Sequence, residues 1–242
     1  MSPEVVKRSF VRSLSRRGVR AGLAGGALLA VLALLAPVNP PGAQTAPPQE
    51  VGITGKVVLL PGPTICDAGT HMLECTDVLL SAELSVLDPL VGKTVKLFGI
   101  KDDYFYCNII DVSSVQDPPP STLAWCGSPV SGCKLNFSVC PGGLSQYWLF
   151  ASPSSGFKPF NPSRGTWLLG DPAWLIASGG SSATPCHEVS FIVPPIPAVT
   201  GVDLWLQAAH REIGEVGPIT LTNVICLTLQ PVGPPCTTDS DC

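Results

Sequence analysis

The sequence lacks the short motifs that mark many catalytic and metal-binding sites. It contains no G-x-S-x-G, no phosphate-loop or dinucleotide-binding glycine pattern, no C-x-x-C and no C-x-x-C-H. A serine-hydrolase elbow, a nucleotide-binding fold, a structural zinc site with short chelate spacing and an attached haem are therefore not indicated. Histidine is scarce at three residues, and charged residues make up only 13% of the chain. We expect no cofactor, no metal and no enzymatic activity.

Glycine and proline are abundant instead, at 24 and 26 residues, and this favours many short strands and turns over long helices. The clearest strands lie near the C-terminal end. From Val202 to Ala208 the apolar residues alternate with Asp203, Trp205 and Gln207, and a second alternating run spans 219–229. Strands with one buried face show this period of two, so we expect an all-β chain.

The first 45 residues have the pattern of a bacterial-type signal peptide. Six basic residues precede the uncharged run from Ala21 to Ala36, and cleavage is expected near Ala43 or Ala46. The apolar run is short for a membrane span of about 20 residues, although an uncleaved anchor is the alternative. Arg16-Arg17 resembles part of a twin-arginine signal, which leaves the export route open. The mature chain is expected to have no stable membrane span and to be secreted or held in the cell envelope.

Removal of this segment takes away six of 14 basic and one of 18 acidic side chains, which leaves eight against 17 and a net charge of about −9. A nucleic-acid partner needs the opposite sign. We therefore expect protein or polysaccharide partners at the cell surface and no nucleic acid.

All ten cysteines follow the signal segment, and an even number in an exported chain predicts disulfides. Pairing by proximity in the sequence is the simplest expectation. It gives Cys66–Cys75, Cys107–Cys126, Cys133–Cys140, Cys186–Cys226 and Cys236–Cys242.

The spacing of the strand patterns divides the mature chain. A first block at 51–117 is followed by a proline-rich linker at 118–133, a second block at 134–230 and a cysteine-containing tail at 231–242. The second block holds seven short strands at roughly ten-residue spacing, which predicts a jelly-roll-like β-sandwich of two packed sheets.

The first block resembles small secreted bacterial OB-fold domains. The resemblance rests on G-x-V near its start, on L-V-G-K-T-V-K-L-F-G at 90–99 and on C-x-I-I-D-V at 107–112. It implies a five-stranded barrel that binds single-stranded nucleic acid or sugars. Four lysines against nine acidic residues in the block disfavour nucleic acid.

The second block is similar to a C-terminal β-sandwich module of uncharacterised secreted bacterial proteins. The matching residues are Ile196, Pro197, Gly201, Leu204, Gln207, Ala208, Leu221, Thr222 and Asn223. This resemblance implies an architecture and no activity.

The aromatic residues of the second block are the best candidates for binding. Trp205 alternates out of phase with Leu204 and Leu206 and so points away from their core, flanked by Asp203 and Gln207. An exposed tryptophan there would form a carbohydrate platform or a protein contact. Core packing of the aromatic residues is the alternative.

The densest group of potential metal ligands is Asp67, His71 and Glu74. We interpret it as a polar disulfide-closed loop, with a metal site as the alternative. His210 is expected in an exposed turn. We therefore expect an exported structural or interaction protein, with a carbohydrate-binding protein as the alternative and a metal-dependent hydrolase as the third hypothesis.

Overall fold

The computed structural model describes residues 48–62, 65–66, 69–102, 107–141, 143–180, 186–194, 201–213, 218–231 and 236. They belong to one unit that spans Ala46–Cys242. The predicted signal segment 1–45, Asp67, Ile196, Pro197, Cys242 and most of the tail lie outside the described residues. Within the described ranges, no helix is long and apolar enough to cross a membrane.

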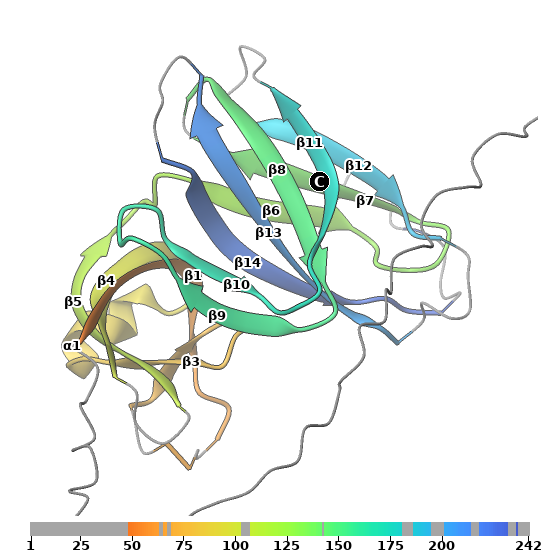
Figure 1. Cartoon of the computed structure of the whole chain (residues 1–242). Coiled ribbons are helices and arrows are strands. Elements are labelled where there is room, and N and C mark those ends of the chain that lie inside the picture. Colours follow the sequence, from red (N-terminus) through yellow and green to blue (C-terminus); the bar gives the residue numbers. More distant parts are fainter. Residues whose placement is uncertain are drawn as a thin grey trace, which may run out of the picture. The chain divides into compact units, whose positions relative to one another are not determined.

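The first half of the described chain forms a closed five-stranded barrel in the order β1-β2-β3-β5-β4 (Figure 1). Its strands are β1 (Gln49–Leu59), β2 (His71–Leu73), β3 (Val78–Ser81), β4 (Thr94–Asp102) and β5 (Asn108–Gln116). Strands β3 and β5 are parallel, and the short helices α1 (Leu84–Leu87) and η1 (Asp88–Leu90) connect β3 to β4. Alternating Val51, Ile53 and Val57 of β1 are fully buried inside, as the period of two predicts.

The second half forms a sandwich of two antiparallel sheets. One sheet has the order β11-β8-β13-β14 and the other the order β12-β7-β6. The strands are β6 (Thr122–Gly127), β7 (Lys134–Cys140), β8 (Ser145–Ser152), β11 (Trp174–Gly180), β12 (His187–Ile192), β13 (Asp203–Glu212) and β14 (Thr220–Thr228). Leu135, Phe137, Leu149, Leu206 and Leu227 pack between the sheets. The expected all-β barrel and sandwich are confirmed.

A further hairpin, β9 (Ser155–Pro159) and β10 (Thr166–Leu169), lies outside the sandwich core. Strand β10 contacts β13 and β14 of the sheet and β1 of the barrel. Leu168 and Leu169 join the barrel core cluster together with Val224 of β14. The outer face of the four-stranded sheet is therefore covered by the hairpin and the barrel.

The expected linker at 118–133 is wrong, because strand β6 lies within it. The three prolines end before Thr122, and Leu123 is buried between the sheets. The side chain of Asn223 on β14 then bonds both backbone groups of Leu123: Oδ1 accepts from its N–H at 2.8 Å and Nδ2 donates to its carbonyl at 2.9 Å. The Asn223 side chain therefore satisfies the backbone N–H and carbonyl of Leu123 on β6, as a neighbouring strand would.

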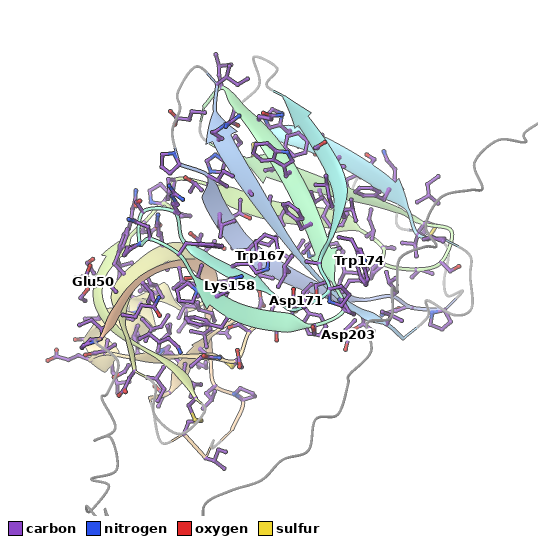
Figure 2. The ribbon with its side chains drawn as sticks, viewed as in Figure 1. Glu50, Lys158, Trp167, Asp171, Trp174 and Asp203 are labelled. Atoms are coloured by element: carbon purple, nitrogen blue, oxygen red, sulfur yellow. A yellow bond between two sulfur atoms is a disulfide. The ribbon has the colours of Figure 1, made fainter. Side chains whose placement is uncertain are left out.

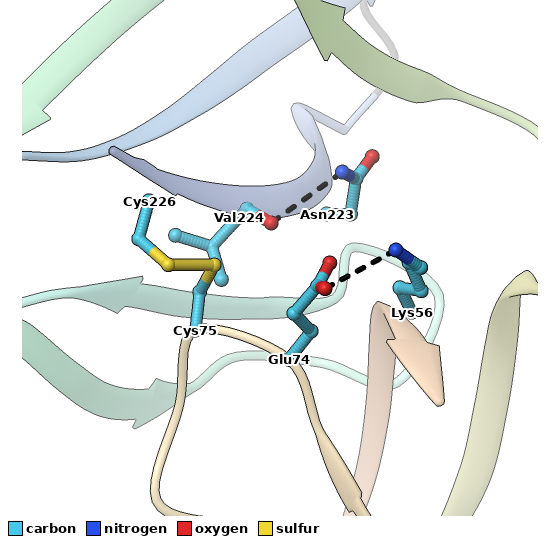
Figure 3. A network of polar contacts seen from close by, with 6 residues as sticks. All are labelled: Lys56, Glu74, Cys75, Asn223, Val224 and Cys226. Atoms are coloured by element: carbon cyan, nitrogen blue, oxygen red, sulfur yellow. Dashed lines mark hydrogen bonds and ion pairs between the residues drawn. A yellow bond between two sulfur atoms is a disulfide. The ribbon is translucent and has the colours of Figure 1, made fainter. Parts of the chain in front are cut away.

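The disulfide Cys75–Cys226 links the barrel to β14, as Figure 3 shows. Beside it, Glu74 pairs with Lys56 of β1 at 3.1 Å, and Trp205 Nε1 donates to the carbonyl of Cys75 at 2.9 Å. This link closes a sequence separation of 151 residues, so it fixes two parts of the chain that are far apart in sequence.

The expected disulfide pairing is wrong throughout. The bonds observed are Cys66–Cys107, Cys75–Cys226, Cys133–Cys236 and Cys140–Cys186, and Cys126 is also disulfide-bonded. Cys133 and Cys140 illustrate the reason. Cys133 immediately precedes the extended strand β7, and Cys140 is the last residue of that strand. At about 3.3 Å per residue that strand separates them by roughly 20 Å, far beyond the reach of a disulfide. Disulfides of this number indicate an oxidising environment.

Candidate functional site

The predicted binding face around Trp205 is not open to a ligand. Trp205 does point away from the sandwich core, as its phase predicts, but it is half-buried against the barrel cluster. Gln207 is fully buried. Its Oε1 accepts from the N–H of Leu168, and its Nε2 donates to the carbonyls of Thr166 and Thr222, each at 2.9 Å. Gln207 therefore holds the hairpin to the sheet, and the exposed face predicted around Trp205 is not found.

Asp203, the third residue of that prediction, is exposed and accepts a hydrogen bond from Thr228 Oγ1 of the paired strand. The alternation of β13 shows which side chains share a face, but not what covers that face. The barrel, which is distant in sequence, covers the face that carries Trp205.

The expected ligand group around His71 is not assembled in the described residues. His71 lies on β2 and is fully buried, with Nδ1 2.9 Å from Thr70 Oγ1 and Nε2 3.2 Å from Asp88. Glu74 pairs with Lys56 instead. The polar disulfide-closed loop expected here is also wrong, since Cys66 and Cys75 have other partners. In the described ranges, no group of three or more His, Cys, Asp or Glu side chains could hold a metal ion.

The hairpin β9–β10 lines two neighbouring pockets. Its loop is closed by Asn161, whose Oδ1 accepts from the N–H and the Oγ of Ser163, and by Gly165 at φ 100°. An asparagine that bonds two residues ahead and a glycine at positive φ are the turn chemistry such a loop needs. Thr166 Oγ1 then donates to the Gly52 carbonyl of β1 at 2.8 Å.

Lys96 fixes the same loop from the barrel side. Its Nζ donates to the Ser163 carbonyl at 2.9 Å, and the side chain is almost fully buried. Burial lowers the pKa of this amine below its ordinary value. The hairpin loop is therefore held by β1 and β4 of the barrel as well as by Gln207 of the sheet.

The first pocket on this hairpin has a volume of about 510 Å³. It is lined by three aromatic side chains, one cation, one carboxylate, one leucine and two glycines: Phe157, Phe160, Trp167, Lys158, Asp171, Leu169, Gly156 and Gly170. Figure 2 shows Lys158 and Trp167 along the hairpin and Asp171 at its end. Phe160, Lys158 and Asp171 are exposed, so aromatic and charged groups face the solvent together.

Trp167 is positioned by its neighbours. Its ring meets the Phe150 ring edge-on at 5.0 Å between centroids, and Gln207 holds the next residue by its N–H. Lys101 Nζ lies 5.4 Å from the centroid of Phe157, within cation–π range. Trp167 and Phe157 are therefore held in place before any ligand binds.

A second pocket of about 240 Å³ adjoins the first, because Phe160 and Trp167 line both. Its other lining residues come from the sheet and the hairpin loop: Phe150, Arg164, Ala209, Ile219 and Leu221. Arg164 is the one charged residue among them. The second pocket is therefore largely apolar.

No protein-family model, no curated protein and no solved structure matches this chain. The site has to be interpreted from its own residues. The sequence analysis identified the aromatic residues of the second block as candidates for binding. Lys158 and Asp171, which lie among them in the sequence, are the signal that the segment 157–171 is partly exposed to solvent.

Buried histidines form a separate polar cluster at one end of the sandwich. His210 is buried at the end of β13, so the exposed turn expected there is wrong, because the strand continues to Glu212. Among the described residues neither ring nitrogen of His210 has a hydrogen-bond partner. Burial, and then the charges of Lys96 and His187, lower its pKa to about 4. His187 stacks on Tyr147, the cross-strand neighbour of His210, at 4.7 Å.

Proposed function

We propose that this chain is an exported, non-enzymatic protein that binds carbohydrate in the 510 Å³ hairpin pocket. The observation that carries the proposal is the combination of three aromatic side chains with Lys158 and Asp171 on one open lining. The volume lies within the range of small-molecule sites, and such sites combine apolar walls with a few polar groups.

The chemistry of a sugar suits this lining. One face of a pyranose ring presents mainly C–H groups, which pack against an aromatic ring, while its hydroxyls accept from an ammonium and donate to a carboxylate. Phe160 and Trp167 would supply the stacking surface, and Lys158 and Asp171 the polar partners. The lining contains one carboxylate, whereas most glycosidases use two, which favours binding over cleavage.

The disulfides and the barrel support export and rigidity in this proposal. We infer from the closed strand order, with β3 parallel to β5, that the barrel is an OB fold. Its role here is to hold the hairpin through Gly52 and Lys96. A cell-envelope or extracellular location in bacteria accords with the signal-like N-terminal sequence.

A glycan-array screen of the mature protein, followed by calorimetry on the best binder, tests the proposal. Phe160→Ala should weaken binding by about tenfold, because a ring stacked in a pocket contributes about 1.4 kcal/mol. Phe160 is 44% exposed, so the fold should tolerate the change. The matched control is Ile192→Ala on β12, which is 70% exposed and lies outside both pockets. No glycan bound by the wild type, or equal binding by Phe160→Ala, would contradict the proposal.

A second candidate function, self-association, rests on strand β11. It is the outer strand of the four-stranded sheet, carries no charged residue, and exposes Trp174, Leu175 and Ile176. Unpaired edge strands are normally protected by charges or proline. An uncharged strand can pair antiparallel with the same strand of a second copy without repulsion.

Light scattering on the mature protein tests this candidate. The wild type should be dimeric, and Leu175→Lys should shift it to monomer, whereas Ile192→Lys on the other sheet should not. A wild type that stays monomeric at high concentration would refute it.

A further inference from the structure

We infer that the carbohydrate ligand carries a short alkyl or acyl group, and that this group occupies the 240 Å³ pocket beside the sugar. The inference rests on the proposed function and extends it to the class of ligand. Its basis is the contrast between two adjoining pockets that share the side chains of Phe160 and Trp167. One pocket has Lys158 and Asp171, and the other is nearly all apolar.

The apolar pocket is large enough for such a group. An apolar cavity of about 150 Å³ can hold benzene, so 240 Å³ has room for a larger hydrocarbon. Two of its side chains remain in contact with water, since Phe160 is 44% and Ile219 is 45% exposed. A hydrocarbon that removes these surfaces from water gains the hydrophobic free energy of both partners.

The pocket does not close on itself because its walls belong to different elements that are fixed elsewhere. Ala209 and Leu221 are buried cross-strand partners on β13 and β14. Trp167 is held by Phe150 and the Gln207 contacts, and the loop backbone of Arg164 accepts a hydrogen bond from the Leu221 N–H at 2.8 Å. The hairpin is therefore anchored above the sheet on both sides of the space.

A molecule that spans both pockets must be polar at one end and apolar at the other. A sugar on the polar lining with an alkyl or acyl substituent directed past the shared Phe160 and Trp167 side chains meets both requirements. An unsubstituted oligosaccharide would leave the apolar pocket hydrated.

Titration of the mature protein with alkyl β-D-glucopyranosides from methyl to octyl, below their micelle concentrations, tests the inference. Each added methylene should tighten binding by about fourfold, the equivalent of 0.8 kcal/mol, until the pocket is filled. Ile219→Asn, a polar replacement at a half-exposed position, should weaken octyl glucoside binding by roughly tenfold and leave methyl glucoside unchanged. Ile192→Asn on β12 is the matched control.

The outcomes separate this inference from the proposed function. If methyl and octyl glucosides bind equally, or if the chain-length dependence survives in Ile219→Asn, the apolar pocket is not used and only this inference fails. Absence of octyl glucoside binding also overturns it, while the glycan array with Phe160→Ala decides the proposed function independently. If 1-octanol binds as tightly as octyl glucoside, the glucose contributes nothing and this inference is refuted, while the glycan array still decides the proposed function.

Discussion

His210 should make the protein less stable in acid, and the size of the effect follows from its position. In the unfolded chain the imidazole takes up a proton near pH 6.5. In the folded protein burial and the nearby Lys96 and His187 lower the pKa of His210 to about 4. Because the unfolded state binds the proton more tightly, the free energy of unfolding is highest above pH 6.5 and falls as the pH drops toward 4.

A difference of about 2.5 pKa units corresponds to about 3 kcal/mol at 1.36 kcal/mol per unit. Urea unfolding at pH 7.5, 6.5, 5.5 and 4.5, followed by tryptophan fluorescence, measures this loss in the wild type. In His210→Gln, which carries no titrating group at that position, the loss between pH 7.5 and pH 4.5 should be smaller by about 2.5 kcal/mol, because the folded-state pKa lies just below the last pH of the series. The difference between the two proteins removes the contribution of the carboxylates.

Parallel curves for the two proteins would refute the reasoning, because His210 would then not be the group that takes up the proton. If His210→Gln fails to fold, an NMR titration of the wild-type histidine rings decides the same question. A His210 ring that titrates near pH 6.5 in the folded protein would contradict the assigned burial.

Three further changes test how the barrel, the hairpin and the sheet are held together. Cys75→Ala with Cys226→Ala should lower the free energy of unfolding by about 2–5 kcal/mol, measured by urea titration, because it removes the link between barrel and β14; an unchanged midpoint would contradict this role. Gln207→Leu should cost about 3 kcal/mol in the same assay, since it leaves the Leu168 N–H and two carbonyls unpaired, and a cost near zero would show that water replaces the amide. Gly52→Ala should lower the melting temperature, because its Cβ would lie 2.0 Å from the Pro162 carbonyl oxygen; a tolerated substitution would mean that the loop moves freely from the barrel.

The strands of this protein were largely predictable because alternation is a local property. All seven strands expected in the second block are present as β7, β8 and β10 to β14. Strand β9 was missed because Ser155–Pro159 contains glycine and proline and packs on one partner only.

The candidate site was less predictable because it depends on contacts between distant segments. Trp205 was placed correctly with respect to its own sheet, yet its surroundings are set by Cys75, 130 residues earlier. No periodicity in the sequence around Phe160 and Trp167 shows whether these side chains line a pocket or belong to the core. Only the fold shows that the loop between them is anchored to Leu221 of β14 and to Lys96 of the barrel, with a pocket beside it.

The disulfide connectivity constrains the order in which this chain can be oxidised as it is made. Cys75 precedes its partner Cys226 by 151 residues, and five other cysteines, beginning with Cys107, are synthesised in that interval. A catalyst that joined each new cysteine to the previous free one would produce Cys66–Cys75 first, which is not a bond of the folded protein. Correct maturation therefore requires either that the thiols remain reduced until β14 has docked or that incorrect early disulfides are exchanged by thiolate attack. We expect production of this protein to depend on a disulfide isomerase as well as on an oxidant.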